Sequence, residues 1–375
     1  APMLFTTAGL LLSLISFGSI HNGITAPWIK TIAEITLILV LFTDASTIHI
    51  PTLLKGSNLP LRLLFIGLPV TMIIGILIAY ALFPNENKWV MALTALILSP
   101  TDAALGVAVV TGNQIPLRIR QTINAESGLN DGLTLPAVLA CMAFLNGSSS
   151  VSGEWHIWLI FMVKQFVFGP LVGALVGWLG GFLTDKASER EWMSSTFQRI
   201  SSIVLAITAY YLAEWIHGNG FIAAFFSGLL LGTRNRTVRE RQHAFGEADS
   251  QILVLFIFLL LGLIMIPESL PHWNLEVFLY ALLNLTVIRV IPAMISLWGT
   301  GLSMQDKFFI SWFGPKGIAS LLFTLMLVVD LGKTNHETLI SIVSLTVLLS
   351  IFLHGISAHM LSKLYRNHHH AHGNN

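Results

Sequence analysis

Two carboxylates, a hydroxyl and an amide lie within six residues, at the start of a stretch that continues into the apolar segment Ala137–Leu145. The run reads Glu126-Ser127-Gly-Leu-Asn130-Asp131-Gly. On a helix, Ser127 and Asp131 share one face, and Glu126 and Asn130 share another, because residues four apart are neighbours. A carboxylate among neutral oxygens can hold a proton or a small hard cation such as Na⁺ or Li⁺. Asp131 is therefore the candidate carrier of a cation or a proton.

The composition indicates that this run crosses a membrane. The chain is 54% hydrophobic and 10% charged, whereas soluble domains have about 25% charged residues. An acid at membrane depth costs about 2.5–3.5 kcal/mol on insertion scales and usually marks an ion or proton path. The single Cys141 excludes a disulfide framework and a cysteine metal cluster. Twelve segments are long and apolar enough to span: 2–20, 30–48, 60–83, 89–110, 117–145, 156–184, 197–217, 219–232, 251–267, 275–300, 306–330 and 337–364.

The loop charges give the orientation of an all-α polytopic membrane protein. Loops on the side of the C-terminus carry Lys55, Arg62, Arg118, Arg120, Lys186, Arg190, Arg199, Arg234, Arg236, Arg239, Arg241, Lys307, Lys363 and Arg366. The opposite side carries only Lys30, Lys88 and Lys333. Cytoplasmic loops hold the excess of basic residues, so the C-terminus is expected in the cytoplasm.

Two of the predicted spans contain helix-breaking residues. The fourth includes Pro100-Thr101-Asp102, and the eleventh includes Gly314-Pro315-Lys316-Gly317. Proline removes a helix donor, and unwound backbone at membrane depth survives only where protein buries it or where it lines a cavity. Interrupted spans at corresponding places in two halves indicate a transporter site. We therefore expect two inverted-topology repeats joined by span 156–184, and six spans in each repeat require a thirteenth helix before residue 1.

Six short motifs together resemble one family, and they cover nearly the whole chain. In chain order they are Phe42-Thr-Asp44-Ala-Ser46, Pro100-Thr-Asp102, Arg118-Ile-Arg120, Glu126-Ser-Gly-Leu-Asn130-Asp131-Gly, Gly314-Pro-Lys-Gly317 and His354-Gly355. This set in this order resembles the NhaP/NHE-type sodium/proton antiporters of the cation/proton antiporter superfamily. The resemblance implies an NhaA-like fold with crossed, unwound helices at its centre. It also implies a homodimer in the cell (plasma) membrane.

The family architecture predicts five segments. Scaffold and dimerisation helices are expected over 1–59, and the first half of a core transport domain over 60–145. A linker helix and further scaffold helices are expected over 146–274, followed by the second core half over 275–365. The residues 366–375 form a His-rich cytoplasmic tail.

The resemblance also assigns roles around Asp131. Ser127, Thr101 and Asp102 are expected to supply oxygens to the cation, with Asp131 as its charged ligand (Na⁺ or Li⁺). A second role is open for Asp102, which could instead cap the N-terminus of a half-helix, where the dipole favours an anion. Asn130 carries no second titrating proton, and an Asn-Asp pair resembles the electroneutral branch of the family. Its amide is expected to order the broken helices.

Three other charged residues are expected to support the site. Arg289 lies inside a span and needs a partner, for which Glu126 is the candidate; in the alternative, Arg289 extends to the membrane surface. Lys316 departs from the Gly-Pro-Arg-Gly found in many relatives, and it could neutralise the C-terminal end of a half-helix. His354 is open between helix packing and pH sensing.

We predict a secondary active transporter that exchanges Na⁺ or Li⁺ for H⁺ by alternating access and contributes to pH homeostasis. The alternatives are a K⁺/H⁺ antiporter and a Na⁺- or H⁺-coupled carrier of an organic solute. An intramembrane aspartyl protease would need Tyr-Asp and Gly-x-Gly-Asp, where this chain has Thr101-Asp102 and Asn130-Asp131. No phosphate-binding glycine loop is present. Membrane lipids are the expected partners, and neither an enzyme activity, a cofactor nor a nucleic acid is expected.

Overall fold

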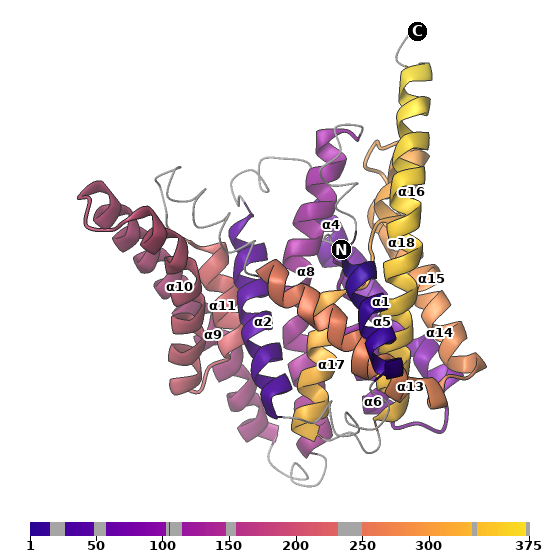
Figure 1. The fold of residues 1–375 in the computed structure, drawn as a ribbon, viewed down its shortest axis with the longest axis horizontal. Helices are drawn as coiled ribbons and strands as arrows, with labels where there is room; N and C mark the ends of the chain where they lie inside the picture. The colour runs from indigo at the N-terminus through magenta and orange to yellow at the C-terminus, as the bar shows by residue number, and fades with distance from the viewer. Residues whose placement is uncertain are drawn as a thin grey trace. The chain divides into compact units, whose positions relative to one another are not determined.

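The computed structural model describes residues 1–15, 27–48, 58–102, 105, 115–147, 155–231, 250–331 and 336–372, and all regular structure within them is helical (Figure 1). The elements are α1 (Pro2–Ile15), α2 (Pro27–Ser46), α4 (Leu59–Arg62), the π-helical η2 (Leu63–Gly67), α5 (Leu68–Leu82), α6 (Lys88–Ile97), α8 (Leu117–Gly147), α9 (Trp155–Glu189), α10 (Ser195–Trp215), α11 (Gly220–Leu229), the π-helical η4 (Leu261–Met265), α13 (Ile266–Ser269), the 3₁₀ turn η5 (Leu270–His272), α14 (Leu275–Leu285), α15 (Val287–Ser296), α16 (Met304–Trp312), α17 (Ile318–Leu331) and α18 (Glu337–His372).

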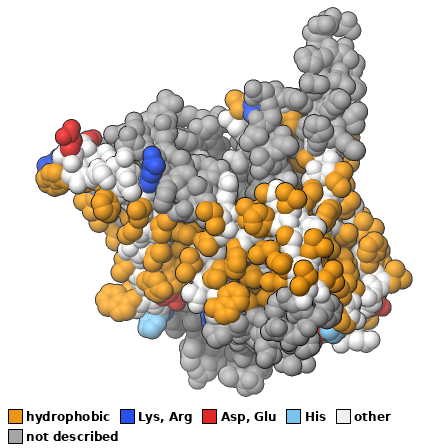
Figure 2. Space-filling model, viewed as in Figure 1, with side chains coloured by type: hydrophobic (Ala, Val, Ile, Leu, Met, Phe, Trp, Pro, Cys, Tyr) orange, Lys and Arg blue, Asp and Glu red, His pale blue; other side chains and the backbone are white. Residues whose placement is uncertain are grey.

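Several of these helices have the length and composition of membrane spans. Six described segments qualify: Leu59–Leu82, Leu117–Leu145, Val163–Glu189, Ser250–His272, Leu275–Ser296 and Glu337–Ala358. Shorter apolar helices cover Pro2–Ile15, Lys88–Ile97, Gly220–Leu229 and Ile318–Val328. Apolar side chains are widespread on the face of the molecule that Figure 2 shows. Exposed apolar residues include Leu171, Leu175 and Trp178 on α9. The chain is a multi-pass membrane protein, while the number of twelve spans and the inverted repeats stay predictions.

The chain divides into two compact units. Unit 1 comprises Ala1–Lys30, Leu53–Thr134 and Leu255–Asn375, and unit 2 comprises Thr31–Thr52 and Leu135–Val254. Within unit 1, α18 packs against α14, α13, α17 and α6, and α5 packs against α6 and α15. All the residues predicted to form the site belong to unit 1.

Unit 2 is held together by close packing of α9 on α11, with α10 against both (Figure 1). Glycines recur every four residues along α9. A Cβ at Gly173 would overlap the backbone of Ala223 on α11, and one at Gly177 would overlap the backbone of Ser227. In a membrane, small residues at such spacing let two helix backbones approach and pack without a hydrophobic driving force.

Both predicted interruptions are confirmed as helix ends. Within the span predicted over 89–110, α6 ends at Ile97, and residues 98–102 are not helical. The span predicted over 306–330 is divided into α16, which ends at Trp312, and α17, which begins at Ile318. The remainder of the first span over 106–110, the basic loop 233–249 and the side chains of the His-rich tail lie outside the described residues.

The packing of α9 on α11 predicts a stability effect. Gly173→Ala and Gly177→Ala insert a methyl group against the backbone of α11, so each should destabilise the protein by about 1–3 kcal/mol. Thermal unfolding in detergent, followed by loss of the monodisperse peak in size exclusion, measures the change. Leu175→Ala, on an exposed position of the same helix, is the control and should unfold within a degree or two of wild type. Equal midpoints for Gly173→Ala and the control would contradict this packing argument.

Candidate functional site

The first break follows the C-terminal end of α6. Leu98 caps this helix, and the proline at position 100 has no N–H to continue it. The next residues, Thr101 and Asp102, are buried. The backbone N–H of Asp102 donates to the carbonyl oxygen of Pro315 at 2.8 Å. A backbone hydrogen bond therefore joins the first break to the second, although more than two hundred residues separate them in the chain.

The second break, residues 313–317, is shaped by two glycines that make room for charged side chains. A Cβ at Gly314 would overlap the guanidinium of Arg289, and a Cβ at Gly317 would overlap the carboxylate of Asp102. Any other residue at either position would push a buried charge away from the backbone. The Gly-Pro-Lys-Gly spacing thus fits the close approach of these two side chains.

Each break carries a charged side chain that caps the helix next to the other break. Asp102 accepts a hydrogen bond from the backbone N–H of Ile318, the first residue of α17, at 3.0 Å. Lys316 donates from Nζ to the carbonyl oxygens of Ser99 at 2.9 Å and Pro100 at 3.2 Å, just beyond the end of α6. Lys316 is fully buried. An anion at the N-terminus of a helix and a cation at its C-terminus both interact favourably with the helix dipole.

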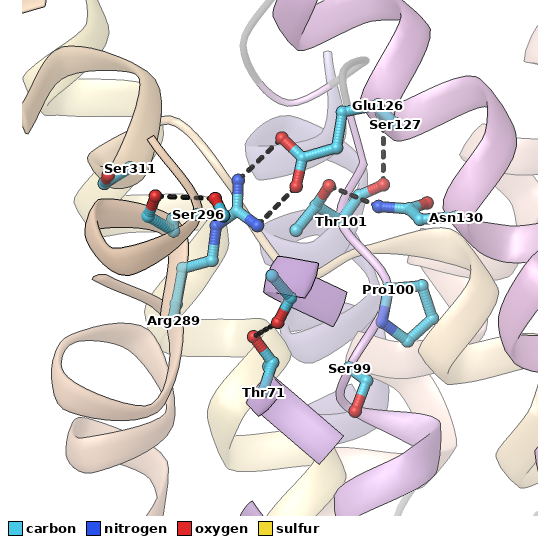
Figure 3. Close-up of polar contacts among 12 residues, drawn as sticks. Thr71, Ser99, Pro100, Thr101, Glu126, Ser127, Asn130, Arg289, Ser296 and Ser311 are labelled. Carbon is cyan, nitrogen blue, oxygen red and sulfur yellow. Dashed lines mark hydrogen bonds and ion pairs between the residues drawn. The ribbon is translucent and has the colours of Figure 1, made fainter. Parts of the chain in front are cut away.

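Helix α8 fixes the first break from the other side, through Thr101 (Figure 3). The hydroxyl of Ser127 donates to the carbonyl oxygen of Thr101 at 2.6 Å, and the amide Nδ2 of Asn130 donates to the hydroxyl of Thr101 at 2.6 Å. Both donors are buried. Four consecutive residues of α8 thus place a hydroxyl and an amide on one residue of the unwound backbone.

Glu126 and Arg289 form a buried, two-pronged ion pair between α8 and α15 (Figure 3). Nη1 donates to Oε1 at 2.5 Å and Nη2 donates to Oε2 at 2.9 Å. The planar guanidinium matches a carboxylate in this geometry. The alternative in which Arg289 extends to the membrane surface is wrong, because its side chain is 6% exposed.

Asp131 lies one helical turn after Ser127 on α8 and is 4% exposed. It is within electrostatic reach of Lys316, together with Glu126 and Arg289. Among the described residues, no group of three His, Cys, Asp or Glu side chains could hold a metal ion. Asp131 is thus a buried carboxylate one helical turn from the Ser127 hydroxyl, which suits a monovalent cation or a proton.

Two residues at the breaks have no sequence motif that singles them out. Ser320 on α17 donates to the carbonyl oxygen of Ile97 at 2.8 Å, and Ser350 on α18 accepts from the backbone N–H of Lys316 at 2.7 Å. The hydroxyl groups of small residues are common in membrane helices. For Ser350, the sequence gives one indication: it lies four residues before His354, so both residues are on the same face of α18.

Ser46 and Asp44, from the first of the resembling motifs, are on α2 in unit 2. The hydroxyl of Ser46 donates to the carbonyl oxygen of Thr43 in its own helix at 2.7 Å.

Comparisons of the sequence with known proteins give a consistent set of relatives. The profile of the family described as "Sodium/hydrogen exchanger, transmembrane" matches residues 1–364. The K(+)/H(+) antiporter NhaP of Alkalimonas amylolytica is 27% identical over 304 residues, which are 78% of this chain and 50% of that protein. The Na(+)/H(+) antiporter of Schizosaccharomyces pombe is 26% identical over 314 residues, which are 76% of this chain and 66% of that protein. The chain thus spans about half the length of the first of these relatives.

The fold is similar to that of a solved antiporter. The sodium proton antiporter MjNhaP1 from Methanocaldococcus jannaschii superimposes with a TM-score of 0.74 and 20% identity, over 94% of this chain and 92% of that chain. At this level of identity the likeness concerns the fold.

The Glu126–Arg289 pair predicts a rescue by a second mutation. Glu126→Leu leaves a guanidinium buried without its partner and should destabilise the protein by about 3–5 kcal/mol, whereas Glu126→Leu combined with Arg289→Met should recover a large part of that loss. Thermal unfolding in detergent measures both. Glu276→Gln, which neutralises an exposed acid, is the control. A double variant that is no more stable than Glu126→Leu would show that the pair is not the source of the loss.

Proposed function

This chain belongs to the sodium/hydrogen exchanger family, and from that premise we propose that it exchanges Na⁺ or Li⁺ for H⁺ across a membrane by alternating access. Cation and proton compete for Asp131. The family supports a secondary active transporter rather than a catalytic enzyme.

The observation that carries this proposal is the balance of buried charge. Three carboxylates and two cations meet around the breaks: Asp102, Glu126, Asp131, Arg289 and Lys316. The charge of Glu126 is balanced by that of Arg289, and the two helix-capping residues, Asp102 and Lys316, balance each other. With both cations protonated, one negative charge remains, which a single monovalent ion or a single proton can neutralise.

Neutralisation of the Asp131 charge couples cation transport to proton transport. A charged carboxylate moved through a low-dielectric interior without a partner carries a large desolvation penalty. Asp131 with a proton or a cation does not carry that penalty, so the core can change its access only in those two states. Exchange follows because both ligands need the same carboxylate.

Neutral oxygens for the cation lie beside Asp131. The hydroxyl of Ser127, one turn before Asp131 on α8, and the carbonyl of Thr101, to which it donates, are oxygens of the type that can coordinate a cation. The carbonyl oxygen of the Asn130 amide is buried, with no hydrogen-bond partner among the described residues. We propose that Ser127 and Thr101 coordinate the cation, and that Asp102 acts mainly as the cap of α17.

The charge count also supports a stoichiometry. Asn130 cannot release a proton, so one cation replaces one proton at Asp131 and the exchange is electroneutral. We further propose a homodimer in the plasma membrane with the C-terminus in the cytoplasm. The ion-carrying core then comprises the helices of 60–145 and 275–365, and the remaining helices form the scaffold.

K⁺ is the second candidate cation. The reason is the name of a relative, the K(+)/H(+) antiporter of Alkalimonas amylolytica. The same carboxylate and the same proton competition apply, and only the size of the coordination shell differs.

A transport assay tests the proposal. Proteoliposomes with a lumenal pH dye and an imposed pH gradient should respond to Na⁺ or Li⁺ pulses in wild type, and Asp131→Asn should lose the response by about a hundredfold or more, because no carboxylate remains to bind either ion. Glu276→Gln is the matched control and should retain the wild-type rate.

Three further outcomes separate the alternatives in this assay. Response to K⁺ but not Na⁺ would select the K⁺/H⁺ alternative. A rate that depends on a potassium/valinomycin voltage clamp would contradict electroneutral exchange. No response to any of the three cations would overturn the antiporter proposal and favour a carrier coupled to an organic solute.

Competition for one carboxylate predicts the pH dependence. As the pH falls below the range in which Asp131 titrates, the apparent KM for the cation should rise by about tenfold per pH unit, because each bound cation must displace one proton. The maximal rate should change less than the KM over the same range. Cation titrations at a series of symmetrical pH values measure this slope. A KM that stays constant across that range would contradict the shared site.

A further inference from the structure

The second break is held at both ends by one face of α18. At its C-terminal end, the backbone N–H of Lys316 donates to the hydroxyl of Ser350 at 2.7 Å. At its N-terminal end, Nε2 of His354 lies 3.1 Å from the carbonyl oxygen of Trp312, the last residue of α16. Ser350 and His354 are 0% and 1% exposed. One turn of an unbroken helix therefore spans the interruption in its neighbour.

Both ring nitrogens of His354 lie near a carbonyl oxygen: Nε2 is 3.1 Å from that of Trp312, and Nδ1 is 3.2 Å from that of Ser350. A neutral imidazole has one N–H and a carbonyl oxygen only accepts, so His354 donates to one of the two. The carbonyl of Ser350 lies inside the unbroken α18, where a helical N–H serves it, whereas Trp312 is the last residue of α16, where carbonyls lack helical donors. We therefore place the hydrogen on Nε2. Nδ1 is then the acceptor, and the hydroxyl of Ser350, 3.3 Å away, donates to it while accepting from Lys316.

The held segment carries Lys316, whose ammonium group caps the end of α6. Lys316 has its backbone N–H on Ser350 and its Nζ on the carbonyl oxygens of Ser99 and Pro100. The segment has no helical carbonyl to accept this N–H, because the helix is interrupted there. The indole of Trp312 donates to the hydroxyl of Ser357 on α18 at 3.2 Å, and its ring lies against the imidazole. The position of the ammonium group therefore depends on α18.

We propose that Ser350 and His354 are positioning residues for ion exchange: together they hold the second break so that Lys316 stays at the end of α6, and through it they set the cation affinity at Asp131. This inference rests on the proposed function. Neither residue is among the proposed cation ligands, and we expect their substitution to change the KM for the cation through Lys316.

Paired substitutions at Ser350 test the hydroxyl. Ser350→Ala removes the acceptor of the Lys316 N–H and should raise the KM for the cation by about fivefold, the equivalent of one lost hydrogen bond. Ser350→Thr keeps the hydroxyl and should restore the KM to within about twofold of wild type. Thr346→Ala is the matched control, because Thr346 is as buried on the same helix but donates to Ile342 within it.

Paired substitutions at His354 test the two ring nitrogens separately. Gln can place an amide N–H where Nε2 lies, and Asn can place a polar atom only where Nδ1 lies. His354→Gln should keep the bond to Trp312 and a KM within about twofold of wild type, whereas His354→Asn should raise the KM by about fivefold. Hydrogen exchange at the peptide 313–317 should be faster in Ser350→Ala and His354→Asn than in wild type, with or without transported cation.

The outcomes separate this inference from the proposed function. If wild type exchanges cations for protons but Ser350→Ala and His354→Asn keep its KM and its hydrogen exchange, the positioning role is wrong. The same holds if all four variants lose maximal rate equally, with no rescue by Thr or Gln, because that pattern indicates misfolding alone. If wild type shows no exchange, the proposed function fails, and the hydrogen-exchange comparison still decides whether α18 holds the break.

Discussion

The structure depends on a constraint that a membrane imposes on interrupted helices: their free backbone groups must find partners inside the protein. Here the two breaks satisfy each other. Asp102 closes the N-terminal end of α17, Lys316 closes the C-terminal end of α6, and a backbone hydrogen bond from Asp102 to Pro315 joins the two stretches of unwound chain. Neither break is complete without the other. The glycine at position 317 belongs to the same arrangement, because it admits the carboxylate of Asp102.

Mutual capping has a consequence for the charge at the centre. Asp102 and Lys316 cap helix ends, and Glu126 pairs with Arg289. The third buried acid, Asp131, lies on α8 close in sequence to the hydroxyl and amide that anchor Thr101. The groups that hold the backbone and the group proposed to hold the ion are thus neighbours on α8. A shift of the breaks would change the oxygens around Asp131, which connects the fold of unit 1 to the cation affinity.

Both interruptions could be predicted from the sequence, because proline and glycine beside a charge are costly at membrane depth unless the helix unwinds there and the protein buries the unwound chain. A buried Arg289 required an acid, and Glu126 was the candidate by charge. The partners of Ser320, Ser350 and His354 could not be predicted, because hydroxyl groups on membrane helices usually bond to their own helix, as Thr346 does. Contacts between segments hundreds of residues apart also leave no local signal in the sequence.

The two buried basic side chains at the breaks, Arg289 and Lys316, each have partners whose geometry suits them. Arg289 meets a carboxylate, and its planar fork gives two parallel hydrogen bonds to Glu126. Lys316 meets two consecutive carbonyl oxygens, which do not present the paired geometry of a carboxylate. An ammonium is compact and carries three donors, whereas a guanidinium brings five donors that a closed, fully buried site would have to satisfy. A lysine at this position is therefore consistent with a break packed this tightly, and Lys316→Arg would have to enlarge it.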